Sequence, residues 1–216
     1  MNKLIVFGDT NISTTRDLYP ALHISDAIKE RHTECDVLSN DPLLNESDRD
    51  LLKRARILQF GSSSLKSEPS RSKLYQSIDV AAKNGAIVSY APRIDTEHWQ
   101  MRSEELRILR SPVATADVVQ VLPQDLPFLA GEADAWSAIS DLNDQGVRLV
   151  LGMLENGVFL LSGEDLRKFP AIKASDADAF LAELLCRLSA LQKPLKACPF
   201  AEIAALVDDA CARFRD

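Results

Sequence analysis

The chain has 216 residues, of which 46% are hydrophobic and 26% charged, and its formal net charge is −7. This composition is ordinary for a globular protein and excludes a disordered chain, and the length allows one sizeable core. The acidic balance disfavours nucleic-acid binding, because a negative surface repels phosphate backbones. No run reaches the roughly 18 apolar residues of a membrane span, and the short apolar start, 1–8, fits no signal peptide. We expect a cytoplasmic protein with neither a nucleic-acid nor a membrane partner.

The four cysteines lack the spacing of metal ligands, so we expect free, buried thiols in a reducing compartment. They are Cys35, Cys186, Cys198 and Cys211. The densest basic run, 53–56, lies at the end of a predicted helix, where positive charge complements the helix dipole. We interpret this run as a helix end and not as a nucleic-acid patch.

Segments typical of strands and helices alternate along the whole chain. Short apolar runs that stop at glycine or polar residues predict strands at 4–7, 35–38, 57–60, 86–90, 118–122, 147–151 and 158–161. Helical spacing and turn signals predict helices at 22–31, 47–54, 70–84, 104–109, 133–143, 178–191 and 202–214. Ser47 is the expected N-cap of the second of these helices.

The order of these elements predicts the fold class. A tight Glu-Asn-Gly turn at 155–157 joins the last two strands as a hairpin. The other strands alternate with helices, which indicates a mainly parallel sheet covered on both faces, a three-layer α/β/α sandwich. No linker, repeat or low-complexity run divides residues 1–216, so we expect one domain. Ligands of such sheets bind beyond the carboxyl ends of the strands.

Several segments, in order, resemble one enzyme family. Residues 57–65 read ILQFGSSSL, like "HFGSISL" of fructokinases, and 81–90 read AAKNGAIVSY, like "AKKxGAxxSYDPN". Trp99 falls at the tryptophan of "DPNxRxxLW". Further matches are ADVV at 116–119, FLAG at 128–131 and the Ala179-Phe180 pair of "GAGDAFxAGLL". Over 47–188 the chain is identified as a cut-down relative of the ribokinase-like (PfkB-type) carbohydrate kinases, fructokinases in particular, which implies their fold.

The resemblance assigns roles to the start of the helix near 178. The family motif "TGAGDAF" holds the catalytic base, which takes a proton from the sugar hydroxyl, and Asp178 stands at that place. The two glycines, whose backbone holds the transferring phosphoryl group, are replaced by Ser175 and Ala177. Asp176 adds a carboxylate between them, and a unit charge about 4 Å from phosphate repels it by about 4 kcal/mol at an effective dielectric of 20. The anion hole is therefore expected to be degenerate.

The other motifs of the family are altered as well. "DPNxR" reads Ala-Pro-Arg-Ile-Asp at 91–95, and the magnesium-organising "NxxE" position keeps only the carboxylate of Asp125. The nucleotide turn "TLGxxG" retains Gly157, whereas Gly152 and Leu154 replace its threonine and first glycine.

Two pieces of the family have no counterpart among the motifs of the sequence. The sugar-binding "GGxxxNxA" segment and the lid sheet should precede Gly61, where only about fifty residues are available without a Gly-Gly pair. The chain also stops before the family's final adenine-flanking strands. Asp9, which follows the first strand, matches an acidic sugar contact of the relatives. Since such kinases often dimerise through the lid, we expect no lid sheet and a monomer or a dimer through another surface.

Three functions are compatible with these residues. The first is a non-catalytic pseudokinase whose strand-end cleft takes a small molecule or a protein partner. The second is a weak sugar kinase that uses ATP and Mg²⁺, with Asp178 as base and Asp125 at the metal. The third is a regulatory or structural subunit of a complete kinase. The plainer interpretations are a helix cap for Asp178, a turn residue for Asp9, surface or packing roles for the three histidines, and a solvated loop for 62–64.

Overall fold

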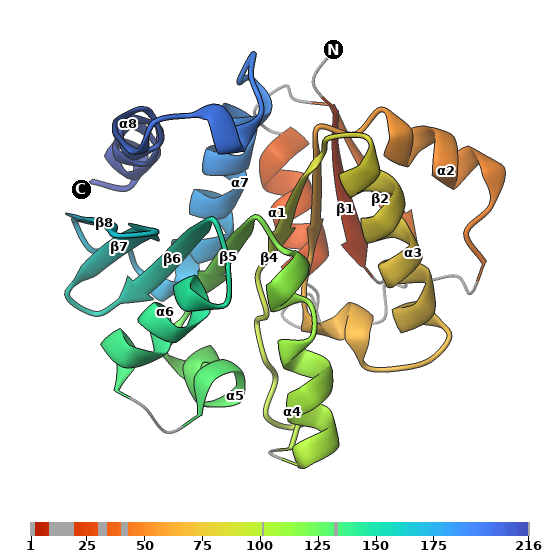
Figure 1. Cartoon of the computed structure of the whole chain (residues 1–216), viewed down its shortest axis with the longest axis horizontal. Coiled ribbons are helices and arrows are strands. Elements are labelled where there is room, and N and C mark those ends of the chain that lie inside the picture. Colours follow the sequence, from red (N-terminus) through yellow and green to blue (C-terminus); the bar gives the residue numbers. More distant parts are fainter. Residues whose placement is uncertain are drawn as a thin grey trace.

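The structure of the chain is a computed structural model, which describes residues 3–8, 20–29, 34–39, 43–100, 102–131 and 134–215. The strands described form one sheet of eight, in the order β2-β1-β3-β4-β5-β6-β7-β8 (Figure 1). The strands are β1 Lys3–Gly8, β2 Glu34–Ser39, β3 Ile57–Phe60, β4 Ile87–Tyr90, β5 Val118–Val121, β6 Leu149–Leu154, β7 Gly157–Ser162 and β8 Asp165–Phe169. The six from β2 to β6 pair in parallel, and β7 and β8 are added antiparallel. No second sheet occurs in these ranges.

Helices cover both faces of the sheet, as Figure 1 shows. They are α1 Pro20–Lys29, α2 Glu46–Lys53, α3 Ser70–Lys83, α4 Ser103–Arg110, α5 Leu126–Ala130, α6 Ala135–Asp144, α7 Ala177–Ser189 and α8 Phe200–Cys211. One buried cluster joins the sheet to α2 through α6, and a second joins it to α1, α7 and α8. Strands β3 and β5 are buried at every residue, as expected of parallel strands covered on both faces. The predicted three-layer α/β/α fold is confirmed.

Each predicted helix and strand is present, with ends shifted by a few residues. The hairpin is also present, because β6 ends at Leu154 and β7 begins at Gly157. The predicted cap of α2 is wrong. The cap is Asn45, whose side chain accepts a hydrogen bond from the Asp48 backbone N–H at 2.8 Å, and Ser47 lies inside the first turn.

The serines after β3 were also predicted wrongly. Residues Ser62–Leu65 form a short 3₁₀ helix, and Ser62 and Ser64 are buried instead of solvated. The Ser64 hydroxyl donates to the carbonyl oxygen of Phe7 at 3.4 Å, so this loop is packed against the end of β1.

None of the four cysteines forms a disulfide, as predicted, but only Cys198 and Cys211 are buried. Cys35 and Cys186 are half-buried, and burial raises the pKa of the Cys35 thiol to about 12. Part of the basic run at 53–56 makes a local ion pair, because Lys53 pairs with Asp50 at 2.9 Å at the end of α2. In the described ranges, no helix combines the length and apolar character that a membrane crossing requires.

Candidate functional site

The candidate site lies at the carboxyl ends of β3, β4 and β5, where three loops meet the start of α7. The loop after β4 is fixed to the loop after β3 by a hydrogen bond from the Ser62 backbone N–H to the Pro92 carbonyl oxygen, 2.8 Å long. It is fixed to the segment after β5 by the Ile94 backbone N–H, which donates to Asp125 Oδ1 at 2.9 Å. This is the edge of the sheet at which ligands of α/β proteins bind.

Asp178 lies in the first turn of α7, as the sequence predicts, and it forms an ion pair. Its Oδ1 accepts a hydrogen bond from Arg93 Nε at 2.8 Å. The Arg93 side chain is 9% exposed and that of Asp178 is 23% exposed, so the pair is largely withdrawn from water. The site therefore holds a cation directly against the carboxylate that stands at the base position.

The rest of the Arg93 side chain is held by β5. Its Nη2 donates to Gln120 Oε1, and Gln120 Nε2 in turn donates to the carbonyl oxygen of Ala177 at 3.2 Å. Among the residues that the structure describes, buried Arg93 Nη1 has no hydrogen-bond partner. The backbone of Arg93 is in the left-handed region, with φ at 51°, which is uncommon for a residue with a side chain. Such conformations persist where the surrounding contacts fix them.

Asp125 is completely buried beside this pair. Its Oδ1 accepts from the Ile94 N–H, and its Oδ2 accepts from the Leu122 N–H at 3.0 Å. Burial raises the pKa of the Asp125 carboxyl, and this effect outweighs the opposing charge of Arg93. Both oxygens are used to hold two loops together, so the structure gives this carboxylate an anchoring role.

The predicted anion-hole residues lie at the start of α7. Ser175 and Asp176 belong to a short 3₁₀ turn, Ala174–Asp176, that leads into the helix, and Ser175 is exposed. Ala177, the first residue of α7, is buried, so its methyl group is part of the core. The Ser175 hydroxyl lies 3.4 Å from Asp176 Oδ1. The turn thus presents side chains and a carboxylate where the family has bare backbone.

The residues at this site do not fit the Mg²⁺ ion that the family resemblance implies. Mg²⁺ requires several oxygen ligands in near-octahedral geometry. Asp125 is engaged by two backbone N–H groups, and Asp178 is paired with the Arg93 guanidinium. In the described ranges, no group of three or more His, Cys, Asp or Glu side chains is placed to hold a metal ion.

The predicted nucleotide-turn residues serve the packing of the hairpin. A Cβ added at Gly152 would lie 2.2 Å from Ile139 Cδ1 of α6, so this glycine allows α6 to approach the sheet. A Cβ at Gly157, where φ is 153°, would lie 2.6 Å from the carbonyl oxygen of Phe169 in β8. Leu154 is half-buried and packs against the first of the two buried clusters. Each of the three has a structural reason that requires no nucleotide.

We expect Gly152→Ala to destabilise the chain by about 1–3 kcal/mol, because the new methyl group overpacks the contact with Ile139. Thermal or urea unfolding measures the change. Ile139→Val removes the Cδ1 atom that clashes, so Gly152→Ala should cost less in that background. An unchanged stability of Gly152→Ala together with weakened ATP binding would instead assign this glycine to a nucleotide.

Asp9, the predicted sugar contact, lies outside the described residues. His98 is exposed, as predicted for a surface histidine, but it has a partner, because its Nδ1 contacts Asp95 Oδ2. This contact holds the pKa of the Asp95 carboxyl below its usual range.

Sequence reasoning missed Arg93. It registered only that the asparagine of "DPNxR" was lost, and no local pattern connects residue 93 to residue 178. One signal could have identified it. Arg93 is a charged residue in the otherwise apolar segment YAPRI at the end of a strand, and a charge in such a segment indicates a buried partner.

The chain was compared with known proteins. No protein-family model matches it. It is 31% identical to the fructokinase of Vibrio alginolyticus over 160 residues, which cover 70% of this chain and 52% of that protein. It is 29% identical to probable fructokinase-4 of Arabidopsis thaliana, with coverages of 69% and 49%. The chain thus spans about half the length of the curated relatives that it matches.

Solved structures show the same architecture. The aminoimidazole riboside kinase of Salmonella enterica, complexed with aminoimidazole riboside and an ATP analogue, superposes with a TM-score of 0.74 at 18% identity, covering 97% of this chain and 91% of that one. The fructokinase of Xylella fastidiosa superposes with a TM-score of 0.77 at 14% identity, covering 98% and 91%. At these identities the likeness establishes the fold.

The eight-stranded sheet and the strand-end site define a protein with the ribokinase-like α/β fold. Combined with the sequence matches, the chain is a fructokinase-like homologue of the PfkB-type carbohydrate kinases, matched over part of their length.

Proposed function

We propose that this chain is a pseudokinase: a fructokinase homologue that does not transfer phosphate and whose strand-end site binds a small molecule or a protein partner. The observation that carries the proposal is the ion pair between Arg93 Nε and Asp178 Oδ1, 2.8 Å long. A general base must present an oxygen to the proton that it takes, within hydrogen-bond distance. Here a guanidinium group occupies that place.

The surroundings of the pair support the same conclusion. Phosphoryl transfer depends almost entirely on positioning and on stabilising the developing negative charge. Asp125 is committed to two backbone bonds, and Ser175 and Asp176 stand at the anion turn. Two lost contributions of about 3 kcal/mol each would slow the reaction by roughly ten-thousand-fold.

We also propose that the protein works in the cytoplasm, because four cysteines without a disulfide are typical of a reducing compartment.

The test is a coupled ADP-release assay with ATP and Mg²⁺ over a panel that includes fructose and ribose. We expect no turnover above that of an Asp178→Ala variant. A turnover near one per second that disappears in Asp178→Ala would instead establish a sugar kinase. A second variant, Arg93→Asn, restores the residue of the family motif and frees Asp178. If Arg93→Asn gains turnover that the parent chain lacks, the Arg93 guanidinium is what prevents catalysis by Asp178. If Arg93→Asn stays inactive, the anion turn is also deficient.

Co-purification from cells addresses the remaining hypothesis, a regulatory subunit. A stable complex with a complete sugar kinase would establish it. Recovery of the chain without such a kinase, together with inactivity in the assay, is the result expected of an independent pseudokinase.

A further inference from the structure

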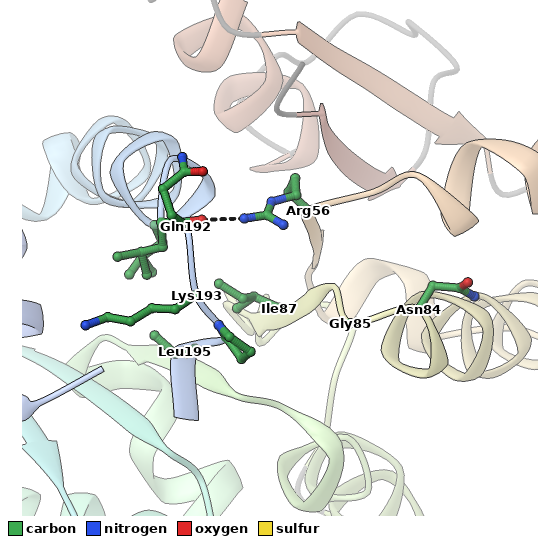
Figure 2. Close-up of a pocket in the computed structure, with 10 residues that line it drawn as sticks. Arg56, Asn84, Gly85, Ile87, Gln192, Lys193 and Leu195 are labelled. Atoms are coloured by element: carbon green, nitrogen blue, oxygen red, sulfur yellow. Dashed lines mark hydrogen bonds between the residues drawn. The ribbon is translucent and has the colours of Figure 1, made fainter. Parts of the chain in front are cut away.

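The pocket in Figure 2 lies away from the candidate site, near the amino ends of β3 and β4, and has a volume of about 240 Å³. Its residue Arg56 immediately precedes β3, and Arg56 Nη2 donates to the carbonyl oxygen of Leu191, just after α7. Its residue Lys193 is paired with Glu202 at 2.6 Å. Both cations of the pocket wall are therefore engaged within the chain, and they fix the segment after α7.

The free edge of the sheet at β8 is a second feature outside the candidate site. Strand β8 is the last in the sheet order, so its outer edge pairs with no other described strand (Figure 1). Residues 163–168 are exposed, whereas Phe169 at the end of β8 is buried and belongs to the cluster that includes α8. An unpaired edge presents a row of backbone N–H and C=O groups to which another strand can pair. The half of β8 next to its turn is therefore open to a second chain.

The turn between β7 and β8 determines which backbone groups face this edge. Ser162 and Asp165 are paired across a two-residue turn whose first residue, Gly163, has φ at 59°. The pair that closes such a hairpin is hydrogen-bonded, and hydrogen-bonded pairs alternate with non-hydrogen-bonded pairs along an antiparallel ladder. Every second residue of β8, beginning with Asp165, thus bonds to β7. Leu166 and Lys168 direct their N–H and C=O groups to the free edge.

The side chains of β8 alternate between the two faces of the sheet. Leu166 is paired with Leu161 of β7, which belongs to the cluster that includes α6, so Leu166 lies on that face. Leu166 is 46% exposed, which is unusual in this chain for a large apolar side chain. Asp165 and Arg167 lie on the other face, where the Arg167 guanidinium stacks 5.2 Å above the Phe169 ring. Among the described residues, neither of these two charges has an ion-pair partner.

We propose that β8 pairs in antiparallel orientation with β8 of a second copy of this chain, about a two-fold axis at Leu166. The two Leu166 residues then lie opposite each other, exchange two backbone hydrogen bonds and cover each other's exposed side chains. Asp165 of each copy lies opposite Arg167 of the other. Glu164, in the turn, lies opposite Lys168 of the other copy. Opposite charges and apolar pairs in such positions stabilise a sheet.

The charges of β8 select this register over its alternatives. A two-fold interface brings the same patch of both copies together, so the residue on the axis lies against itself. An axis at Asp165, Arg167 or Lys168 would place a charged side chain against its own copy, which is destabilising. In the exposed part of β8, the axis at Leu166 is the one that avoids this clash and also gives every charged residue an opposite charge.

The first test is sedimentation equilibrium of the whole chain. Because the paired segment is short, we expect a weaker dimer than interfaces of about 1,200–2,000 Å² give, with a dissociation constant on the order of 10–100 μM. Arg167→Asp sets two carboxylates against each other at each end of the pairing, and Asp165→Arg sets two guanidinium groups there. Each variant alone should dimerise at least tenfold more weakly than the parent chain. An equimolar mixture of the two should associate about as well as the parent, because each altered charge then faces its opposite.

A cross-link tests the position of the axis without changing a charge. A hydrogen-bonded pair has a Cα–Cα distance of about 5.5 Å, which a disulfide can span, so Leu166→Cys should form a covalent dimer under mild oxidation. Leu43→Cys is the matched control, since Leu43 is 77% exposed and lies outside the sheet; it should cross-link much less. A parent chain that stays monomeric at about 500 μM would overturn the proposal. So would a dimer that persists in both charge variants, or a mixture that associates no better than either variant alone.

Discussion

Asp178→Ala is expected to lower the free energy of unfolding by about 2–3 kcal/mol, because it leaves the Arg93 guanidinium without its counter-ion in a site where that side chain is 9% exposed. Removing one partner of a buried pair is costly mainly because the other charge remains buried. The effect should lie at the lower end of the range for buried pairs, since Arg93 keeps its contact with Gln120 and Asp178 is 23% exposed.

Urea unfolding of four proteins measures this: the parent chain, Asp178→Ala, Arg93→Met and the double variant. Arg93→Met should cost less than Asp178→Ala, because the remaining carboxylate is the more exposed partner and can be hydrated. The double variant should be more stable than Asp178→Ala alone. Asp176→Ala is the control, since that neighbouring carboxylate has no ion pair among the described residues, and it should change stability less.

The same variants distinguish a catalytic role of the Asp178 carboxylate from a structural one. A catalytic base is needed for turnover, and its removal need not weaken the fold. In this chain we expect the reverse, a loss of stability without a loss of turnover. A change in stability below about 0.5 kcal/mol for Asp178→Ala would mean that the ion pair contributes nothing, and the main support for the pseudokinase proposal would be lost.

The sequence predicted those parts of the fold that local chemistry determines. Strands such as β3 and β5 are mostly apolar and buried at every residue, which is typical of parallel strands in the middle of a sheet. Strand β8 was not predicted because its sequence, DLRKF, is charged and mostly exposed. Edge strands are commonly charged, and this one is held by pairing with β7 and not by a buried face of its own.

The site was predicted in position but not in its contacts. The motif match placed Asp178 at the start of a helix, because a helix start is a local property. The partner of Asp178 is 85 residues away in the chain, on a loop whose backbone at Arg93 adopts a positive φ. Neither the pairing nor the conformation has a local signature. Asp125 was similarly recognised as a carboxylate near the metal position. Its bond from Leu122 is local, but its bond from Ile94 depends on how the loop after β4 meets the segment after β5.

Asp48→Asn is expected to have a larger effect than any change at the candidate site, about 3–5 kcal/mol. Asp48 of α2 pairs with Lys73 of α3 at 3.1 Å, and the Lys73 side chain is only 2% exposed. The substitution keeps the size of residue 48 but leaves the Lys73 ammonium buried without an opposite charge. Because total stabilities are about 5–15 kcal/mol, the variant should melt far below the parent chain.

The double variant Asp48→Asn with Lys73→Met distinguishes charge burial from a loss of packing. Methionine retains most of the apolar length of lysine, so it keeps the contact between α2 and α3 while removing the buried charge. We expect the double variant to recover most of the stability lost in Asp48→Asn, and differential scanning calorimetry of both measures it. Asp50→Asn is the matched control on the same helix, because its pair with Lys53 is exposed and should be worth little. If Asp48→Asn proves as mild as Asp50→Asn, the Lys73 ammonium is reached by water, and the pair does not hold α2 against α3.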